Sequence, residues 1–386
     1  MKDPFAELRA REYPGPDARI FLDSASYGLL PLRTIRAVNA LVERRNRGDG
    51  FDPRDWGRIL WRGRQAAADL LGCDVSGIAL APNTSYGVNL AARWVGTMPP
   101  GRVVMPDGEF PANVFPWMEL ERQGFVIDRI PSGAEGRVDE ARLLEAAAGL
   151  DVRAVAVSAV QFHTGHRVDL EALGDLCSAR GIAFAVDGIQ ALGLEPLDPV
   201  TLGIDVLSTG GQTWLCSPWG SGFVYLSERV RRDLRPPLPS WLAFQSTQRM
   251  ESLLTYDPAF LEDVRRYELH TLGLQDVLGL AESLELLNEM GVGRIREYLH
   301  GLHEPVLDWI RDTDGAIAVT PEDPEGRAGI LAFRVAAGMR ELAEAMRAAG
   351  LLISVREGAI RLAPHFYTAP TDMERVRDVL DGWPMG

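Results

Sequence analysis

Short apolar runs alternate with amphipathic segments in this chain, from about residue 65 to residue 226. The runs have the length of β-strands and occur at residues 78–81, 102–105, 125–128, 154–157, 182–186, 204–207 and 222–226. Their nearly continuous hydrophobicity is typical of strands that are covered on both faces. Segments such as 139–150 and 169–180 have the pattern of crossover helices. The alternation therefore predicts an α/β fold with a mainly parallel seven-stranded sheet and helices on both faces.

The pattern changes after residue 230, where a proline-rich stretch at 235–240 is followed by a long helical segment at 274–312. Short strands at 329–334, 352–355 and 359–362 then alternate with helices at 339–349 and 371–382. This predicts a smaller α+β C-terminal domain. We divide the chain into an N-terminal segment (1–20), a large domain (21–260) and a small domain (261–386).

Composition limits the partners of this chain. The net charge of -14 argues against a nucleic-acid partner, which needs a basic face. No apolar stretch approaches the ~20 residues that span a bilayer. The three cysteines are too scattered for a disulfide framework or a zinc site, so we predict no metal and a cytoplasmic location.

Three motifs follow predicted strands, at the edge of the sheet where ligands gather. Residues 82–89 open a helix, and Thr84 and Ser85 could either seat a phosphate or simply cap that helix. Asp187 ends a strand, where it could hold a proton on a pyridine nitrogen or cap a turn. Phe110 could stack on a flat ring or pack in the core.

The order of these features is more specific than any one of them. A phosphate seat near residue 84, an aromatic residue near 110, the segment 161–163, Asp187 with Gln190, and the loop 210–213 follow one another at strand ends. Over about residues 20–370 the chain resembles the aminotransferase class V family of fold-type I pyridoxal-phosphate enzymes. This family includes isopenicillin N epimerase-like proteins, cysteine desulfurases and kynureninases. Further matches lie at residues 21–31, 265–271 and 355–367.

The resemblance implies a role for each matching residue. It implies that the cofactor phosphate is bound by Thr84, Ser85 and the Tyr86 amide. The cofactor ring would be contacted by Phe110, Asp187, Gln190 and Gln212, and the substrate by Arg361, Arg356, Tyr27 and His365. Arg361 would bind the substrate α-carboxylate, for which a planar guanidinium is suited. Thr271 would reach the phosphate of a neighbouring subunit, which implies a homodimer with shared active sites.

Thr213 stands where the resemblance places a lysine, and the chain's single lysine is Lys2. A threonine hydroxyl cannot form an imine with the cofactor aldehyde. Pyridoxal 5′-phosphate would therefore be held non-covalently or as an external aldimine with the substrate amine. Three explanations remain open: a deliberate replacement that traps this adduct, a natural enzyme that uses another base such as His163 or His365, and a natural pseudoenzyme.

The resemblance thus predicts a pyridoxal-phosphate enzyme that acts on an amino acid or amino-acid conjugate, in an inactive, slow or trapped form. Residues 320–361 lack the nucleophilic cysteine that desulfurases carry before the arginine matching Arg361. This argues against persulfide chemistry. β-Elimination by a lyase, amino transfer by an aminotransferase and epimerisation all fit.

Overall fold

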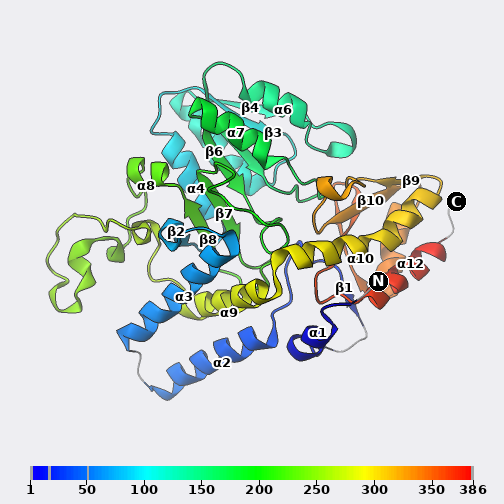
Figure 1. Cartoon of the computed structure of the whole chain (residues 1–386), viewed down its shortest axis with the longest axis horizontal. Helices are drawn as coiled ribbons and strands as arrows, with labels where there is room; N and C mark the ends of the chain where they lie inside the picture. Colours follow the sequence, from blue (N-terminus) through cyan, green and yellow to red (C-terminus); the bar gives the residue numbers. More distant parts are fainter. Residues whose placement is uncertain (1–2, 16–18, 50–51, 384–386) are drawn as a thin grey trace.

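The computed structural model describes residues 3–15, 19–49 and 52–383. Its larger sheet has seven strands in the order β2 (Ile78–Leu80), β8 (Gly222–Leu226), β7 (Val206–Gly210), β6 (Ala183–Asp187), β5 (Val152–Ser158), β3 (Arg102–Pro106) and β4 (Val126–Ile130). Strand β8 runs antiparallel to both of its neighbours, and the other neighbouring pairs are parallel. The prediction of a mainly parallel seven-stranded sheet is confirmed (Figure 1).

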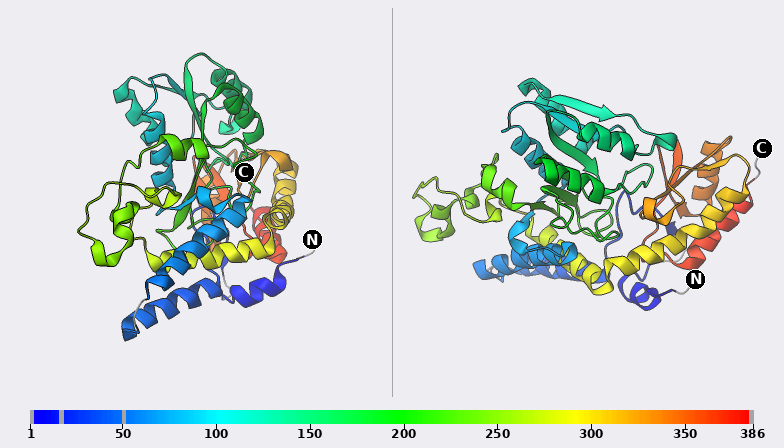
Figure 2. Two further views of the ribbon diagram at one scale, coloured as in Figure 1. Left: turned by 60° about the vertical axis from the view of Figure 1, so that its left-hand side comes forward. Right: turned by 45° about the horizontal axis from the view of Figure 1, so that its top comes forward.

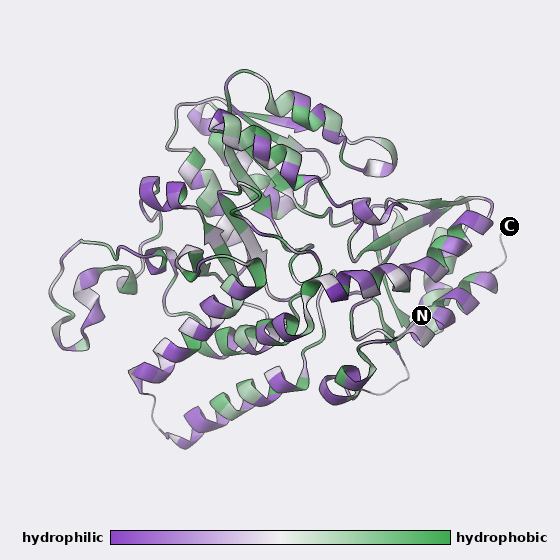
Figure 3. Ribbon diagram, viewed as in Figure 1, coloured by the Kyte–Doolittle hydropathy of each residue, from purple (hydrophilic) through white to green (hydrophobic). Residues whose placement is uncertain are grey.

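Each face of this sheet buries a hydrophobic core of its own. Along β5, Ala154 and Ala156 join the core beneath α4 (Thr84–Val95), whereas Val155 and Val157 join the opposite core. This alternation follows from the two-residue repeat of a strand. Figure 3 shows mostly apolar strands surrounded by helices in which hydrophilic and hydrophobic residues alternate. The remaining helices of this region are α5 (Phe115–Met118), α6 (Glu140–Ala147), α7 (Leu170–Arg180) and α8 (Glu228–Asp233).

The structure corrects three predicted elements. The strand expected at 352–355 is divided into β11 (Leu351–Leu352) and β12 (Ser354–Arg356), which belong to different sheets. The strand expected at 125–128 is the edge strand β4; it pairs only with β3 and leaves the Val126 side chain exposed, so it is not covered on both faces. The single helix expected at 274–312 is broken into α9 (Leu274–Met290) and α10 (Val292–Asp312). Gly291 separates them with a φ of 82°, a conformation that lies outside the right-handed helix and that glycine adopts readily.

The smaller sheet is antiparallel, in the order β12 (Ser354–Arg356), β13 (Ala359–Leu362), β10 (Leu331–Val335) and β9 (Ala316–Ala318). It packs with α10, α11 (Met339–Ala348) and α12 (Pro370–Asp381). Strand β11 (Leu351–Leu352) instead pairs with the N-terminal β1 (Ile20–Phe21). The chain's beginning is therefore joined to its C-terminal third (Figure 1).

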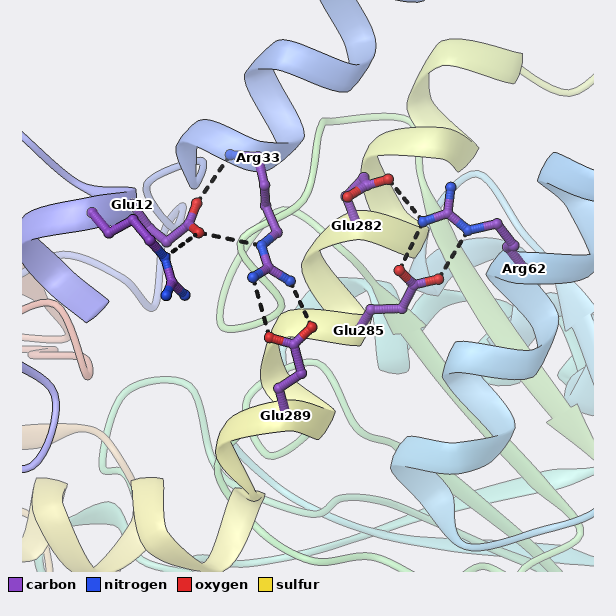
Figure 4. A network of polar contacts seen from close by, with 7 residues as sticks. Glu12, Arg33, Arg62, Glu282, Glu285 and Glu289 are labelled. Atoms are coloured by element: carbon purple, nitrogen blue, oxygen red, sulfur yellow. Dashed lines mark hydrogen bonds and ion pairs between the residues drawn. The ribbon is translucent and has the colours of Figure 1, made fainter. Parts of the chain in front are cut away.

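Helices α2 (Leu32–Arg47) and α3 (Pro53–Leu71) pack along α9, and α1 (Ala6–Glu12) packs against α2. Arg33 of α2 pairs with Glu12 of α1 and with Glu289, and Arg62 of α3 pairs with Glu282 and Glu285 (Figure 4). These ion pairs connect all three helices to α9.

Residues 235–263 project from the body of the molecule in every view (Figures 1 and 2). This segment contains only short 3-10 helices, at Trp241–Ala243, Gln245–Gln248 and Met250–Ser252. Leu254 and Tyr256 in this segment are 81% and 83% exposed. An apolar surface of this kind marks a contact region in many proteins.

Candidate functional site

The carboxyl ends of three neighbouring strands bring together the polar residues at the centre of the site. Asp187 ends β6 and is the register partner of Ser158 on β5 and of Ser208 on β7. Its side chain is 2% exposed, and Oδ1 accepts a hydrogen bond from the Ile189 amide at 2.9 Å. The sheet therefore holds a buried acid at the edge where ligands of α/β proteins gather.

A cavity of about 270 Å³ opens beside Asp187. It is lined by Ala25, Ser26, Phe110, Ser158, Val160, Phe162, Asp187, Ile189, Gln190, Gln212, Thr213, Arg356 and Arg361. Seven of these were predicted as site residues from the sequence: Phe110, Asp187, Gln190, Gln212, Thr213, Arg356 and Arg361. A larger cavity, of about 750 Å³, lies between α1 and the start of α12 and contains none of the predicted site residues.

Burial shapes the titration of Asp187. Loss of solvent raises the pKa of this carboxyl to about 7, the Ile189 amide opposes the rise, and the nearby Glu109 carboxylate adds to it. A buried acid that keeps a proton near neutral pH can donate a hydrogen bond or a proton to a basic ligand atom.

Arg361 is buried in β13 and held by four acceptors. Its Nε donates to Ser354 Oγ at 3.0 Å, one terminal nitrogen donates to the Phe162 carbonyl at 2.9 Å, and the other contacts Ser26 Oγ at 2.7 Å and Asp23 Oδ1 at 3.1 Å. Asp23 thus neutralises a guanidinium whose pKa burial lowers. Arg356 is exposed at the mouth of the cavity and approaches the same Ser26 hydroxyl at 3.4 Å.

Thr213 lies in the loop after β7 and is 2% exposed. Its hydroxyl donates to the Ile189 carbonyl at 3.0 Å. The neighbouring Gln190 accepts from the Trp214 indole at 2.7 Å and donates to the Ala25 carbonyl at 3.0 Å. Both side chains are therefore held in place at the cavity wall, and Gln190 keeps one N–H for a ligand. Lys2 lies outside the described residues.

Both histidines predicted from the sequence lie away from the cavity lining. His163 packs against Gly108 and Gly136, and burial lowers its pKa. His365 is fully buried; it contacts the Trp214 carbonyl through Nε2 at 2.9 Å, and its Nδ1 accepts from the Phe366 amide. Burial lowers the pKa of His365 to about 4. Both of its ring nitrogens are occupied by the protein, so the structure does not support a substrate contact or a role as base.

The expected phosphate seat lies at the start of α4, beside the cavity rather than in its lining. Asn83 caps this helix by accepting a hydrogen bond from the Tyr86 amide at 3.0 Å. From the sequence this amide is expected to bind a phosphate, but its N–H is already used. Thr84 Oγ1 is buried with no hydrogen-bond partner, and Ser85 is exposed. The Thr84 carbonyl accepts from Ser208, whose register partner is Asp187.

Two further predicted residues lie on the surface of the single chain. Tyr27 is 40% exposed and its ring packs between Phe21 and Trp219, next to the cavity residue Ser26. Thr271 is exposed and does not line the cavity. Its predicted contact with a neighbouring subunit stays a prediction.

Sequence reasoning missed Ser26, Ser158 and Phe162, and it missed Glu109 behind them. Ser26 and Glu109 lie inside motifs that drew attention for other residues, at 21–31 and 108–117. For Glu109, the available sequence signal was a glutamate directly before the aromatic Phe110 in a predicted site motif. The serines carried none, because their roles depend on contacts with distant segments.

The fold and the cavity define an α/β protein with a ligand site at the carboxyl edge of a mainly parallel sheet. More specifically, the chain belongs to the aminotransferase class-V family, whose sequence profile matches residues 20–368. An isopenicillin N epimerase from Streptomyces clavuligerus is 29% identical over 343 residues, which cover 84% of each chain.

Solved structures agree with this fold. The apo cysteine desulfurase from Thermococcus onnurineus NA1 matches with a TM-score of 0.87 at 21% identity, over 99% of both chains. A lysine-to-alanine mutant of C-DES with glycine covalently linked to the PLP cofactor also gives 0.87, at 19% identity, over 97% of this chain and 99% of that one. The class-V family is PLP-dependent.

Within residues 3–15, 19–49 and 52–383, no helix combines the length and apolarity needed to cross a bilayer. The same residues contain no group of three or more His, Cys, Asp or Glu side chains that could hold a metal ion.

Proposed function

We propose that this chain binds pyridoxal 5′-phosphate without a covalent link to the protein, and that its site serves an amino acid or amino-acid conjugate. The observation that carries the proposal is the convergence of Asp187, Arg361 and Thr213 on one cavity. Asp187 supplies an acid for a ring nitrogen and Arg361 a cation for a carboxylate, whereas Thr213 has a hydroxyl and no amine.

The residues fit this cofactor in three places. The unpartnered Thr84 hydroxyl lies at a helix start, where free N–H groups favour a phosphate. Asp187 has one amide donor, which leaves acceptor capacity for a protonated ring nitrogen. Phe110 lines the cavity and can cover a flat ring. When bound, the cofactor supplies an aldehyde that condenses with amines and a ring that withdraws electrons from the substrate Cα.

We further propose that Thr213 occupies the position of the family's anchoring lysine, so that this chain is impaired in lyase or aminotransferase chemistry. The lining supports this reading, since the described cavity wall contains neither lysine nor histidine. Loss of general acid–base help typically lowers a rate by ~10²–10⁴-fold. The alternatives are a natural lysine-less binding pseudoenzyme and an epimerase-type enzyme with another base; the placement of His163 and His365 favours the first of the two.

Absorbance tests the proposal. After incubation with pyridoxal phosphate and desalting, we expect the protein to lose the yellow imine band unless an amine substrate is present. The change Thr213→Lys should restore a band that survives desalting, and Thr371→Lys, at an exposed site outside the cavity and outside segment 235–263, serves as the control. A stable band in the unsubstituted protein would refute the reading of position 213. Turnover of amino acids by Thr213→Lys separates an impaired enzyme from a binding protein.

We also propose that the working form is a cytoplasmic homodimer. The projecting segment 235–263 exposes apolar side chains that a second copy would cover, and Thr271 follows it on the surface. The described cysteines are all free thiols, which suits a reducing compartment.

A further inference from the structure

Glu109 is a buried carboxylate that the proposed function does not use. It follows β3, in the loop that carries Phe110, and is 7% exposed. Four donors converge on it: the Ser158 amide at 2.9 Å and Gln161 Nε2 at 2.7 Å on Oε1, and Asn113 Nδ2 at 3.0 Å and the Ser158 hydroxyl on Oε2. The two oxygens of this carboxylate therefore accept two hydrogen bonds each.

These contacts join two loops that line the cavity. Glu109 binds Gln161, and the adjacent residues Phe110 and Phe162 pack edge to face with ring centres 5.2 Å apart. The Phe162 carbonyl in turn accepts from Arg361. The position of Phe110 and one support of Arg361 therefore both depend on the segment that Glu109 holds.

Glu109 also lies close to Asp187, since Ser158, which binds Glu109 through both its amide and its hydroxyl, is the strand partner of Asp187. The two buried acids have opposite surroundings. Glu109 has four donors, whereas Asp187 has one, the Ile189 amide. A negative charge at Glu109 disfavours the ionised form of Asp187, and Asp187 has fewer donors to stabilise that form.

We propose that Glu109 is a positioning residue that holds Phe110 at the cavity and whose negative charge adds to burial in favouring the protonated form of Asp187. In the ligand-free site, that proton is available to a basic ring atom. The transfer of this proton to a bound cofactor ring rests on the proposed function, whereas the placement of Glu109 beside Asp187 does not. The raised pKa of Asp187, which is due first to burial and in part to Glu109, agrees with this assignment. Among the described residues packed around Asp187, Glu109 is the charged group whose electrostatic field raises the pKa of Asp187.

The electrostatic part is tested without any ligand. Carbon-13 NMR of labelled aspartate carboxyls, with Asp187→Asn to assign the signal, gives the titration midpoint of Asp187. We expect a midpoint near 7 in the unsubstituted protein and a decrease of roughly 0.5–1 unit in Glu109→Gln. Glu121→Gln removes the same charge from an exposed site and should change nothing. Equal midpoints in both variants would overturn the electrostatic part.

The positioning part uses Glu109→Asp, which keeps the charge but shortens the side chain. Its Asp187 midpoint should stay near that of the unsubstituted protein, whereas amide hydrogen exchange across residues 108–113 should become roughly tenfold faster, as expected on losing a hydrogen bond. Unchanged exchange would overturn the positioning part. Thermal melting shows that each variant is folded. Because both measurements omit the cofactor, failure of pyridoxal-phosphate binding in the absorbance test remains a separate result.

Discussion

The ion pair between Arg64 and Glu268 gives a sharp test of how the site's surroundings are held. Glu268 is completely buried, and Arg64 of α3 binds it through two nitrogens at 2.7 Å and 2.5 Å. The Leu80 amide of β2 donates to the same carboxylate at 3.0 Å. This pair therefore joins α3, β2 and the segment that leads to Thr271.

We expect Arg64→Met to lower the free energy of unfolding by about 3–5 kcal/mol, because it leaves the buried Glu268 charge without its cation. His270, with Nε2 3.4 Å from Glu268, offers little compensation because burial lowers its pKa. Arg62→Met, two residues earlier on the same helix, is the matched control. Arg62 is 38% exposed, so its pairs with Glu282 and Glu285 are screened and should contribute about 1 kcal/mol or less.

Urea unfolding at pH 7, followed by circular dichroism, measures both effects. The double variant Arg64→Met, Glu268→Met should regain much of the stability, since it removes the unpaired charge as well. A loss below about 1 kcal/mol for Arg64→Met, or a double variant no more stable than the single one, would refute this account of the pair.

Three other predictions concern the site and the assembly. Thr84→Val should weaken pyridoxal-phosphate binding by roughly tenfold in a fluorescence titration, the value of about one hydrogen bond, without lowering the melting temperature. Asp187 has its folded pKa raised to about 7, so the folded state holds a proton that the unfolded state loses near pH 4. The contribution of Asp187 to the free energy of unfolding should therefore fall by about 4 kcal/mol between these pH values, and urea unfolding of the unsubstituted protein and of Asp187→Asn should show this as a pH-dependent difference between the two. Leu254→Asp with Tyr256→Asp should convert a dimer to monomers in sedimentation experiments, whereas Leu150→Asp, also 81% exposed, should not.

Much of the large sheet follows from local sequence. Each buried strand needs apolar residues on both faces, so β5, β6 and β8 appear in the sequence as continuous apolar runs. The edge strand β4 looks similar in sequence, because an apolar run does not reveal that one side lacks a neighbour. The break at Gly291 was missed because a single glycine is tolerated within helical patterns, and the packing of α9 and α10 on different parts of the molecule decides its φ.

The candidate site was predictable where a residue's backbone position determines its place in the fold. Asp187 ends β6 and Thr213 follows β7, so both lie at the carboxyl edge of the sheet and line the cavity. His163 also follows a strand, yet its ring turns toward Gly108 and Gly136. Side-chain direction in a loop depends on packing with distant residues. For the same reason, the sequence could not reveal that Asn83 occupies the Tyr86 amide.

The free-energy cost of burying charged groups bears on how the residue at position 213 affects ligand binding. Arg361 has a compensating partner in Asp23, but Asp187 has a single amide donor and no cation among the described residues. An acid in such a place contributes little to folding and reduces stability wherever it ionises. A ligand that presents a protonated ring nitrogen would remove this penalty whether or not an amine stands at position 213. On the proposed function, a threonine in place of a lysine acts on the covalent chemistry alone, while the groups proposed to orient a ring and a carboxylate keep their geometry. It follows that binding and turnover should separate in this chain: ligand-induced stabilisation should persist in the unsubstituted protein and be lost in Asp187→Ala.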